Sequence, residues 1–143
     1  MVRHVRQWLV WILLFGLVGT EIELLLLEHY DGASQYIPLV LIAAALGAVV
    51  WHMSRPGPLS LRTLVVLMSL FLVAGAIGVG LHFKGAAEFQ YETDPAIGRW
   101  ELVKKVMRSK APPVLAPGVM LQLGLIGLAY ALSDSMSRRS DHP

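Results

Sequence analysis

The chain has 143 residues, of which 55% are hydrophobic and 15% are charged, and its formal net charge is +2. Soluble domains carry roughly 25% charged residues, so this composition predicts an integral membrane protein, and the length suits a single membrane domain over residues 1–143. The chain contains no cysteine, which excludes disulfides, thiolate metal sites and cysteine nucleophiles. The small charge, without a clustered basic patch, argues against nucleic acid as a partner.

Four apolar stretches are long enough to cross a bilayer, for which a helix needs roughly 17–25 residues. They cover about residues 7–27, 37–52, 61–82 and 113–132. The first stretch begins like a signal peptide, but its apolar run resumes late and no small-residue cleavage motif follows, so we expect a retained helix. The sequence therefore predicts an all-α membrane protein with four transmembrane helices, arranged as a four-helix bundle.

The first helix carries carboxylates within its apolar run. Glu21 and Glu23 lie inside the run, and Glu28 and His29 follow at its end. A charged side chain inside a membrane helix costs roughly 2.5–3.5 kcal/mol, so such residues are functional candidates. Glu21 and Glu28 are seven residues apart and share a helix face with His29, whereas Glu23 points toward another helix or another subunit.

Two short segments have matching patterns: residues 29–36 read HYDGASQY, and residues 82–89 read HFKGAAEF. Each follows an apolar run, which predicts that a helix ends there, with the histidine in its last turn and a glycine after it as the cap. The match suggests an internal repeat, in which two helical hairpins lie in parallel.

The third helix places three glycines near the depth of the acidic residues in the first helix. Small residues allow membrane helices to approach closely. We therefore expect Gly75, Gly78 and Gly80 to receive the acidic face of the first helix. In the fourth helix we expect Gln122 to be a buried amide that can hydrogen-bond a carboxyl group.

The third connection contains an amphipathic helix over about residues 95–109, which we expect to begin at Asp94-Pro95. Trp100, Val103 and Met107 lie on its apolar face, and basic residues lie on the opposite face. This pattern is typical of a helix at the membrane surface, and the alternative is that the apolar face packs on a partner subunit.

Histidine and carboxylate side chains on the outer side suggest a possible metal or proton site. Its candidate residues are Glu21, Glu28, His29, His82 and Glu88. These residue types suit a transition metal ion, although no Glu-x-x-His or His-x-x-x-His spacing is present. We expect the remaining histidines, His4, His52 and His142, to be solvated or interfacial.

These patterns favour a non-enzymatic accessory or scaffold subunit, with the lipid bilayer and either other membrane subunits or further copies of the chain as partners. One alternative is a metal-binding or proton-relay protein, and a second is an oligomeric transporter or channel. Lys and Arg are equally frequent on the two sides of the four helices, so the flanks of the first helix decide the orientation. Arg3 and Arg6 before it, against Glu28 and Asp31 after it, favour two cytoplasmic termini in a bacterial inner membrane.

Overall fold

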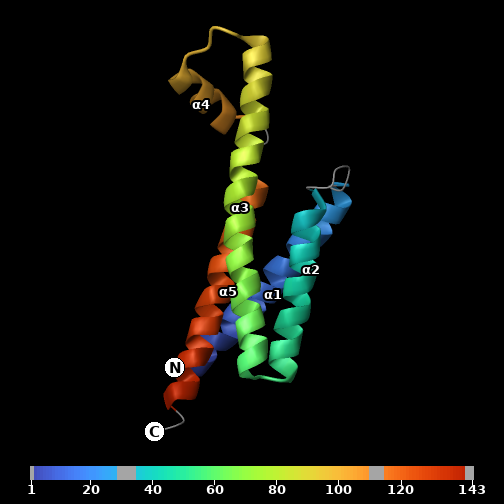
Figure 1. Ribbon diagram of the computed structural model, residues 1–143, viewed down its shortest axis with the longest axis vertical. Helices are drawn as coiled ribbons and strands as arrows, with labels where there is room; N and C mark the ends of the chain where they lie inside the picture. The colour runs from blue at the N-terminus through green and yellow to red at the C-terminus, as the bar shows by residue number, and fades with distance from the viewer. Residues whose placement is uncertain (1, 29–34, 110–114, 141–143) are drawn as a thin grey trace.

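A computed structural model describes residues 2–28, 35–109 and 115–140 of the chain, and its regular elements are all helices (Figure 1). Those helices are α1 (Val2–Leu26), α2 (Tyr36–Ser54), α3 (Pro58–Thr93), α4 (Arg99–Met107) and α5 (Leu115–Ser140). All except α4 contain a stretch long and apolar enough to cross a membrane. The predicted class, an all-α protein with four helices of membrane-spanning length, is confirmed.

The four long helices form a ring in the order α1, α2, α3, α5, and each packs on its two neighbours. Among the described residues the backbones of the diagonal pairs, α1 with α3 and α2 with α5, do not approach each other closely. The chain runs up and down through this ring, so the start of α1, the end of α5 and the α2–α3 turn lie at one end (Figure 1). We call this end the hairpin end and the opposite end the α4 end.

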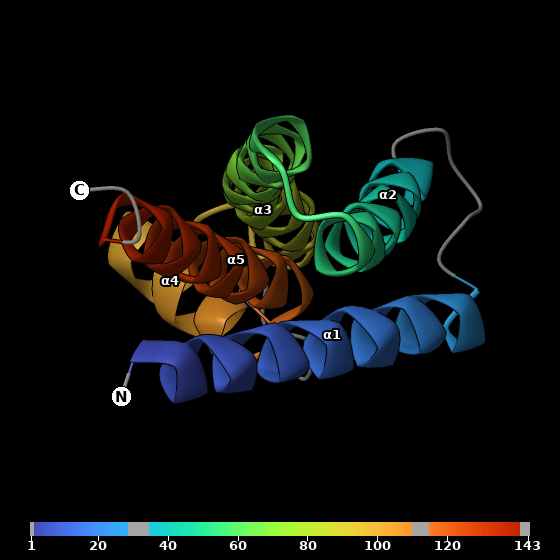
Figure 2. The same ribbon diagram turned by 90° about the horizontal axis from the view of Figure 1, so that it is seen from below.

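Helix α1 crosses the bundle obliquely, from α5 at the hairpin end to α2 at the α4 end (Figure 2). Its buried side chains recur every three or four residues, at Val10, Leu13, Leu17 and Leu24. This spacing places them on one face, which packs against the core of the bundle. Phe71 of α3 is fully buried in the same core.

Helix α3 is longer than the sequence analysis predicted. It has 36 residues and is therefore about 54 Å long, while the hydrocarbon core of a bilayer is about 30 Å thick. The expected helix end at residues 82–89 was wrong, because α3 continues through them to Thr93. Gly85 does not adopt the left-handed conformation of a helix cap, and Lys84 lies 3.7 Å from Glu88 one turn later.

The other copy of the repeated pattern lies largely outside the described residues, at positions 29–34. Helix α1 ends before it, at Leu26, and Glu28 adopts a left-handed backbone conformation with φ 50°. The repeat of two parallel hairpins therefore stays a prediction, and it loses the support of a shared helix end.

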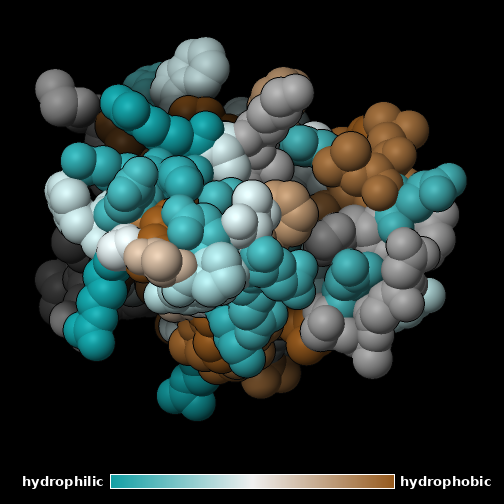
Figure 3. Space-filling view, turned by 90° about the horizontal axis from the view of Figure 1, so that it is seen from above, coloured by the Kyte–Doolittle hydropathy of each residue, from teal (hydrophilic) through white to brown (hydrophobic). Residues whose placement is uncertain are grey.

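Helix α4 lies beside the part of α3 that projects past the bundle (Figure 1). It begins after Gly98 rather than at the expected Asp94-Pro95, and Asp94 instead accepts a hydrogen bond from the backbone N–H of Ala96 at 3.3 Å. Leu102 and Val106 of α4 pack on Ala87 of α3. Seen from the α4 end, hydrophilic side chains cover much of the described surface (Figure 3).

Part of the expected apolar face of this helix packs on α3, and part of it is exposed. Ile97 and Val106 are buried in the contact with α3, and Val103 is half-buried. Trp100 is 70% exposed and Met107 is also exposed, so these two side chains remain available to a membrane surface or a partner. Lys104 Nζ lies 5.3 Å from the centre of the Trp100 ring.

Close packing of α3 on α5 depends on glycine in both helices. A Cβ atom on Gly75 would lie 2.9 Å from the backbone oxygen of Pro117, and one on Gly78 would lie 2.9 Å from the Pro117 side chain. These glycines thus receive α5 rather than the acidic face of α1, and the third expected packing glycine, Gly80, has open space around it.

Helix α5 also contributes glycines to this contact with α3. A Cβ atom on Gly124 would lie 2.9 Å from the backbone oxygen of Met68, and one on Gly127 would overlap the Met68 side chain. Gly16 of α1 likewise faces Leu123 of α5. Because lipid is as apolar as the helix surfaces, such close approach is a main source of attraction between membrane helices.

These contacts predict that alanine is tolerated at some glycines and not at others. Gly75→Ala and Gly124→Ala should each lower the free energy of unfolding by about 1–3 kcal/mol, because the new methyl group meets backbone atoms. Gly80→Ala is the matched control, since nothing lies within 4 Å of its Cβ position. Thermal unfolding in mild detergent measures the difference, and equal stability of all three variants would contradict this packing.

Candidate functional site

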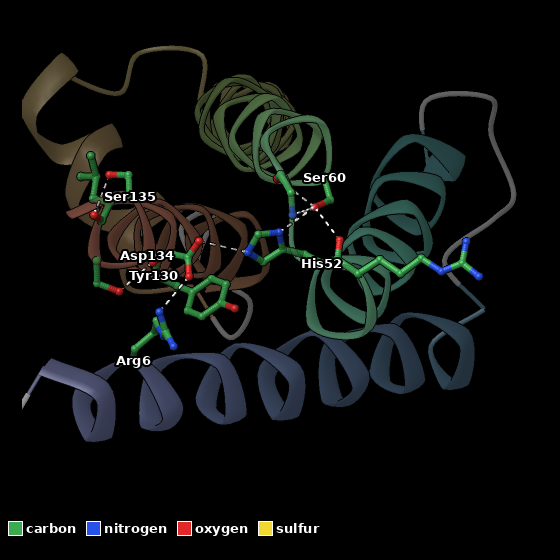
Figure 4. Close-up of polar contacts among 10 residues, drawn as sticks. Arg6, His52, Ser60, Tyr130, Asp134 and Ser135 are labelled. Carbon is green, nitrogen blue, oxygen red and sulfur yellow. Dashed lines mark hydrogen bonds and ion pairs between the residues drawn. The ribbon is translucent and has the colours of Figure 1, made fainter. Parts of the chain in front are cut away.

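The most connected polar group of the described chain lies at the hairpin end of the bundle (Figure 4). It consists of Arg6, His52, Ser60 and Asp134, and we call it the polar clamp. Each residue comes from a different membrane-length helix, in the order α1, α2, α3 and α5. The clamp therefore connects all four helices of the ring.

Asp134 is the centre of the clamp. Its Oδ1 atom accepts a hydrogen bond from Arg6 Nη1 at 2.8 Å, and its Oδ2 atom lies 3.4 Å from His52 Nε2. The Asp134 side chain is only 7% exposed, while that of Arg6 is 27% exposed. A buried carboxylate needs compensation by charge or hydrogen bonds, and here each oxygen has its own partner.

His52 links Asp134 to Ser60. The histidine is 1% exposed, its Nδ1 atom lies 2.8 Å from Ser60 Oγ, and its ring packs edge-on against Tyr130 with ring centres 6.0 Å apart. The carboxylate of Asp134 favours a proton on Nε2 in either charge state of the ring. Ser60 then donates to Nδ1 of a neutral ring or accepts from Nδ1 of a charged one.

Ser60 also builds the turn that joins α2 to α3. Its Oγ atom accepts a hydrogen bond from the backbone N–H of Gly57 at 3.1 Å, which satisfies a donor at the start of α3. The same atom lies within hydrogen-bonding distance of the carbonyl oxygens of Gly57 and Arg55, at 3.1 and 3.2 Å. The turn residue Pro58 at the first position of α3 suits the helix start.

Ser, His and Asp together are also the residue types of a hydrolase triad, but this arrangement does not suit nucleophilic catalysis. Ser60 is only 2% exposed and its hydroxyl is engaged by the α2–α3 turn, so a substrate cannot reach it. The carboxylate of Asp134 is bonded to Arg6 as well as facing His52, so it does not serve the histidine alone. The geometry instead supports a structural role, in which polar bonds fix the ends of four helices.

The clamp was not predicted from the sequence, and the expectation that His52 is solvated or interfacial was wrong, because His52 is buried. A signal was nevertheless present in the spacing of buried residues. Arg6 continues the buried face of α1 one turn before Val10, and Ser60 precedes Leu64 of α3 in the same way. Asp134 lies four residues after the buried Tyr130 of α5.

The predicted metal or proton site is dispersed in the structure. Glu21 is half-buried on α1 and Glu28 is exposed at the end of that helix, whereas His82 and Glu88 are exposed on α3. The backbones of helices α1 and α3 do not approach each other closely within the described ranges. His29 lies outside the described residues.

Within residues 2–28, 35–109 and 115–140, no group of three or more His, Asp or Glu side chains could hold a metal ion. Glu88 is instead paired with Lys84 across one helical turn. The structure therefore offers no support for the expected transition metal site among the residues that it describes.

The expected buried polar residues lie on the outside of this chain. Glu23 of α1 and Gln122 of α5 are both exposed, because each points away from its helix's packed face. Glu21, by contrast, has one buried carboxylate oxygen, Oε2, which forms no hydrogen bond with the described part of the chain.

Comparison with models of protein families, with curated proteins and with solved structures finds no match to this chain. The fold defines the class of the protein as a helical bundle with four membrane-length helices.

The clamp predicts a large loss of stability when Asp134 is removed. Asp134→Ala removes the carboxylate that accepts from Arg6 and faces Nε2 of His52, so the free energy of unfolding should fall by about 3 kcal/mol. Denaturant-driven unfolding in detergent measures this change. Glu88→Ala is the control, since it breaks only an exposed ion pair on α3. A loss for Asp134→Ala no greater than for this control would refute the clamp.

Proposed function

We propose that the protein is a non-enzymatic accessory or scaffold subunit of a larger membrane assembly, in which α1 contacts a partner helix. The observation that carries this proposal is the exposed carboxylate of Glu23. It lies one turn before the end of a membrane-length helix, and it makes no hydrogen bond or ion pair with the described residues. Such a group is costly against lipid and is stabilised by a donor or cation from another chain.

Two polar side chains of α3 differ from Glu23, because they are bonded within their own helix. The hydroxyls of Thr63 and Ser69 donate to carbonyl oxygens one turn earlier in their own helix, at 3.1 and 2.9 Å. Gln122 resembles Glu23 rather than these residues, because its amide is exposed about two turns into α5 without a bond to the described chain. The exposed surfaces of α1 and α5 thus each carry one polar side chain, Glu23 and Gln122, that can bond a group of another chain.

The exposed face of α1 has the pattern of a helix contact. Large apolar side chains recur there at alternating intervals of three and four residues; they are Trp8, Trp11, Phe15, Val18, Ile22 and Leu25. This spacing is that of a helix–helix seam. Gly19 lies on the same face with nothing within 4 Å of its Cβ position, which leaves room for close approach of a partner backbone.

A photoreactive side chain at Phe15 tests this proposal in native membranes, with one at the exposed Val40 of α2 as the control. We expect the Phe15 position to form adducts with a protein, either a second copy or another subunit. Glu23→Leu and Gly19→Leu should each reduce these adducts by about tenfold, because they remove the polar anchor or fill the contact. Gly47→Leu, at another glycine with open surroundings, should have no effect.

If the photoreactive side chain at position 15 of the otherwise wild-type protein forms adducts only with lipid, the subunit proposal is contradicted. Loss of protein adducts in the Gly47→Leu variant as well would show that the effect is unspecific.

We further propose that the protein resides in a bacterial inner membrane with both termini in the cytoplasm. The hairpin end holds the start of α1, the end of α5 and the α2–α3 turn, together with Arg6, Arg55 and Arg62, which suits the positive-inside rule. The projecting part of α3 and α4 would then lie on the outer side.

This orientation predicts opposite labelling of two introduced cysteines. In intact inner-membrane spheroplasts, a membrane-impermeant maleimide should react with Gly98→Cys beside α4 and spare Pro56→Cys in the α2–α3 turn. Both variants should react after the membrane is permeabilised. Labelling of Pro56→Cys alone in intact spheroplasts would reverse the orientation.

A further inference from the structure

An open groove of about 570 Å³ lies between α2 and α3 at the hairpin end. Its volume is within the usual range of ligand sites, roughly 300–1,000 Å³. Two small side chains, Ala44 and Ala48 of α2, leave the space, and Val66 and Leu67 of α3 form the facing apolar wall. Its lining residues all belong to α2 and α3, and none belongs to α1.

The surface of the groove is almost entirely apolar. Trp51 and Arg62 line it near the α2–α3 turn, where α2 ends at Ser54 and α3 begins at Pro58. The hydroxyl of Thr63 also lines the groove but donates to its own helix. Indole and guanidinium groups are typical of the boundary between lipid headgroups and acyl chains.

The depth of the groove corresponds to one leaflet. Ala44 lies ten residues before Ser54, which is about 15 Å along the helix and half of the roughly 30 Å hydrocarbon core. Beyond this depth the groove ends. A partner helix would continue past the middle of the bilayer, whereas an acyl chain of one leaflet would not.

Arg62 supplies a positive charge that the described protein does not neutralise. It is exposed, and no described carboxylate lies within 4 Å of its guanidinium group. The described ion pairs of the hairpin end are those of the clamp, which belong to Arg6, His52 and Asp134. A phosphate group is a favourable partner for an unpaired guanidinium.

From this polarity, depth and charge we propose that the α2–α3 groove binds one anionic phospholipid. The phosphate lies against Arg62, and an acyl chain follows the groove over Ala48 to Ala44. This site goes beyond the subunit proposal, because it lies on different helices and requires no partner protein.

Native mass spectrometry of the full chain, released from nanodiscs, tests the site. Its probes are phosphatidylglycerol and phosphatidylcholine with the same acyl chains. We expect one phosphatidylglycerol molecule to remain bound to the wild type, with weaker retention of phosphatidylcholine. Glycerol phosphate, which lacks acyl chains, should not displace the lipid.

Two pairs of variants separate the acyl and phosphate contacts. Ala44→Leu fills the deep part of the groove and should weaken retention about tenfold, while Ala43→Leu, one residue away and outside the groove, should not. Arg62→Gln should weaken retention about fivefold, while Arg55→Gln in the adjacent turn should have little effect. Ala43 and Ala44 are both exposed, so a leucine at either position leaves the packing of the core intact.

Three results would overturn the proposal: equal retention of the two lipids, retention unchanged by Ala44→Leu, or displacement by glycerol phosphate alone. Crosslinking of Ala44 to a protein helix in native membranes would also overturn it, by assigning the groove to a different occupant.

Discussion

The buried carboxylate of Asp134 is the constraint on which the bundle depends. Helices in lipid gain little from the hydrophobic effect, so their association relies on close packing and polar bonds. Asp134 accepts a hydrogen bond from Arg6 of α1 and lies beside His52 of α2. His52 is in turn hydrogen-bonded to Ser60 at the start of α3. These bonds fix the hairpin end, and the glycine contacts between α3 and α5 extend the close packing toward the other end.

The two ends of the molecule consequently use their polar groups differently. At the hairpin end, the buried polar side chains satisfy one another within the chain. Toward the α4 end, Glu21 keeps an unbonded buried oxygen and Glu23 is exposed on α1. This contrast supports the proposed role in assembly, because the polar group at the hairpin end is closed within the chain and the exposed carboxylate of Glu23 can meet another chain.

Sequence periodicity was sufficient to predict four membrane-length helices, because long apolar runs are a local property of the sequence. The length of α3 was mispredicted, since Gly85 resembles a cap although Lys84, Glu88 and the adjacent alanines favour continued helix. The partners of the glycines depend on ring order, which no local pattern encodes. The clamp was missed because its four members are far apart in the chain, from Arg6 to Asp134.

Distance measurement between spin labels in liposomes tests most directly whether Asp134 fixes the hairpin end. The chain has no native cysteine, so labels can be placed at Met53→Cys on α2 and Leu132→Cys on α5, two exposed positions near the clamp. If Asp134 fixes the hairpin end, this pair gives one narrow distance distribution, and Asp134→Asn gives a broad one. A distribution that stays equally narrow in the Asp134→Asn variant would contradict this role.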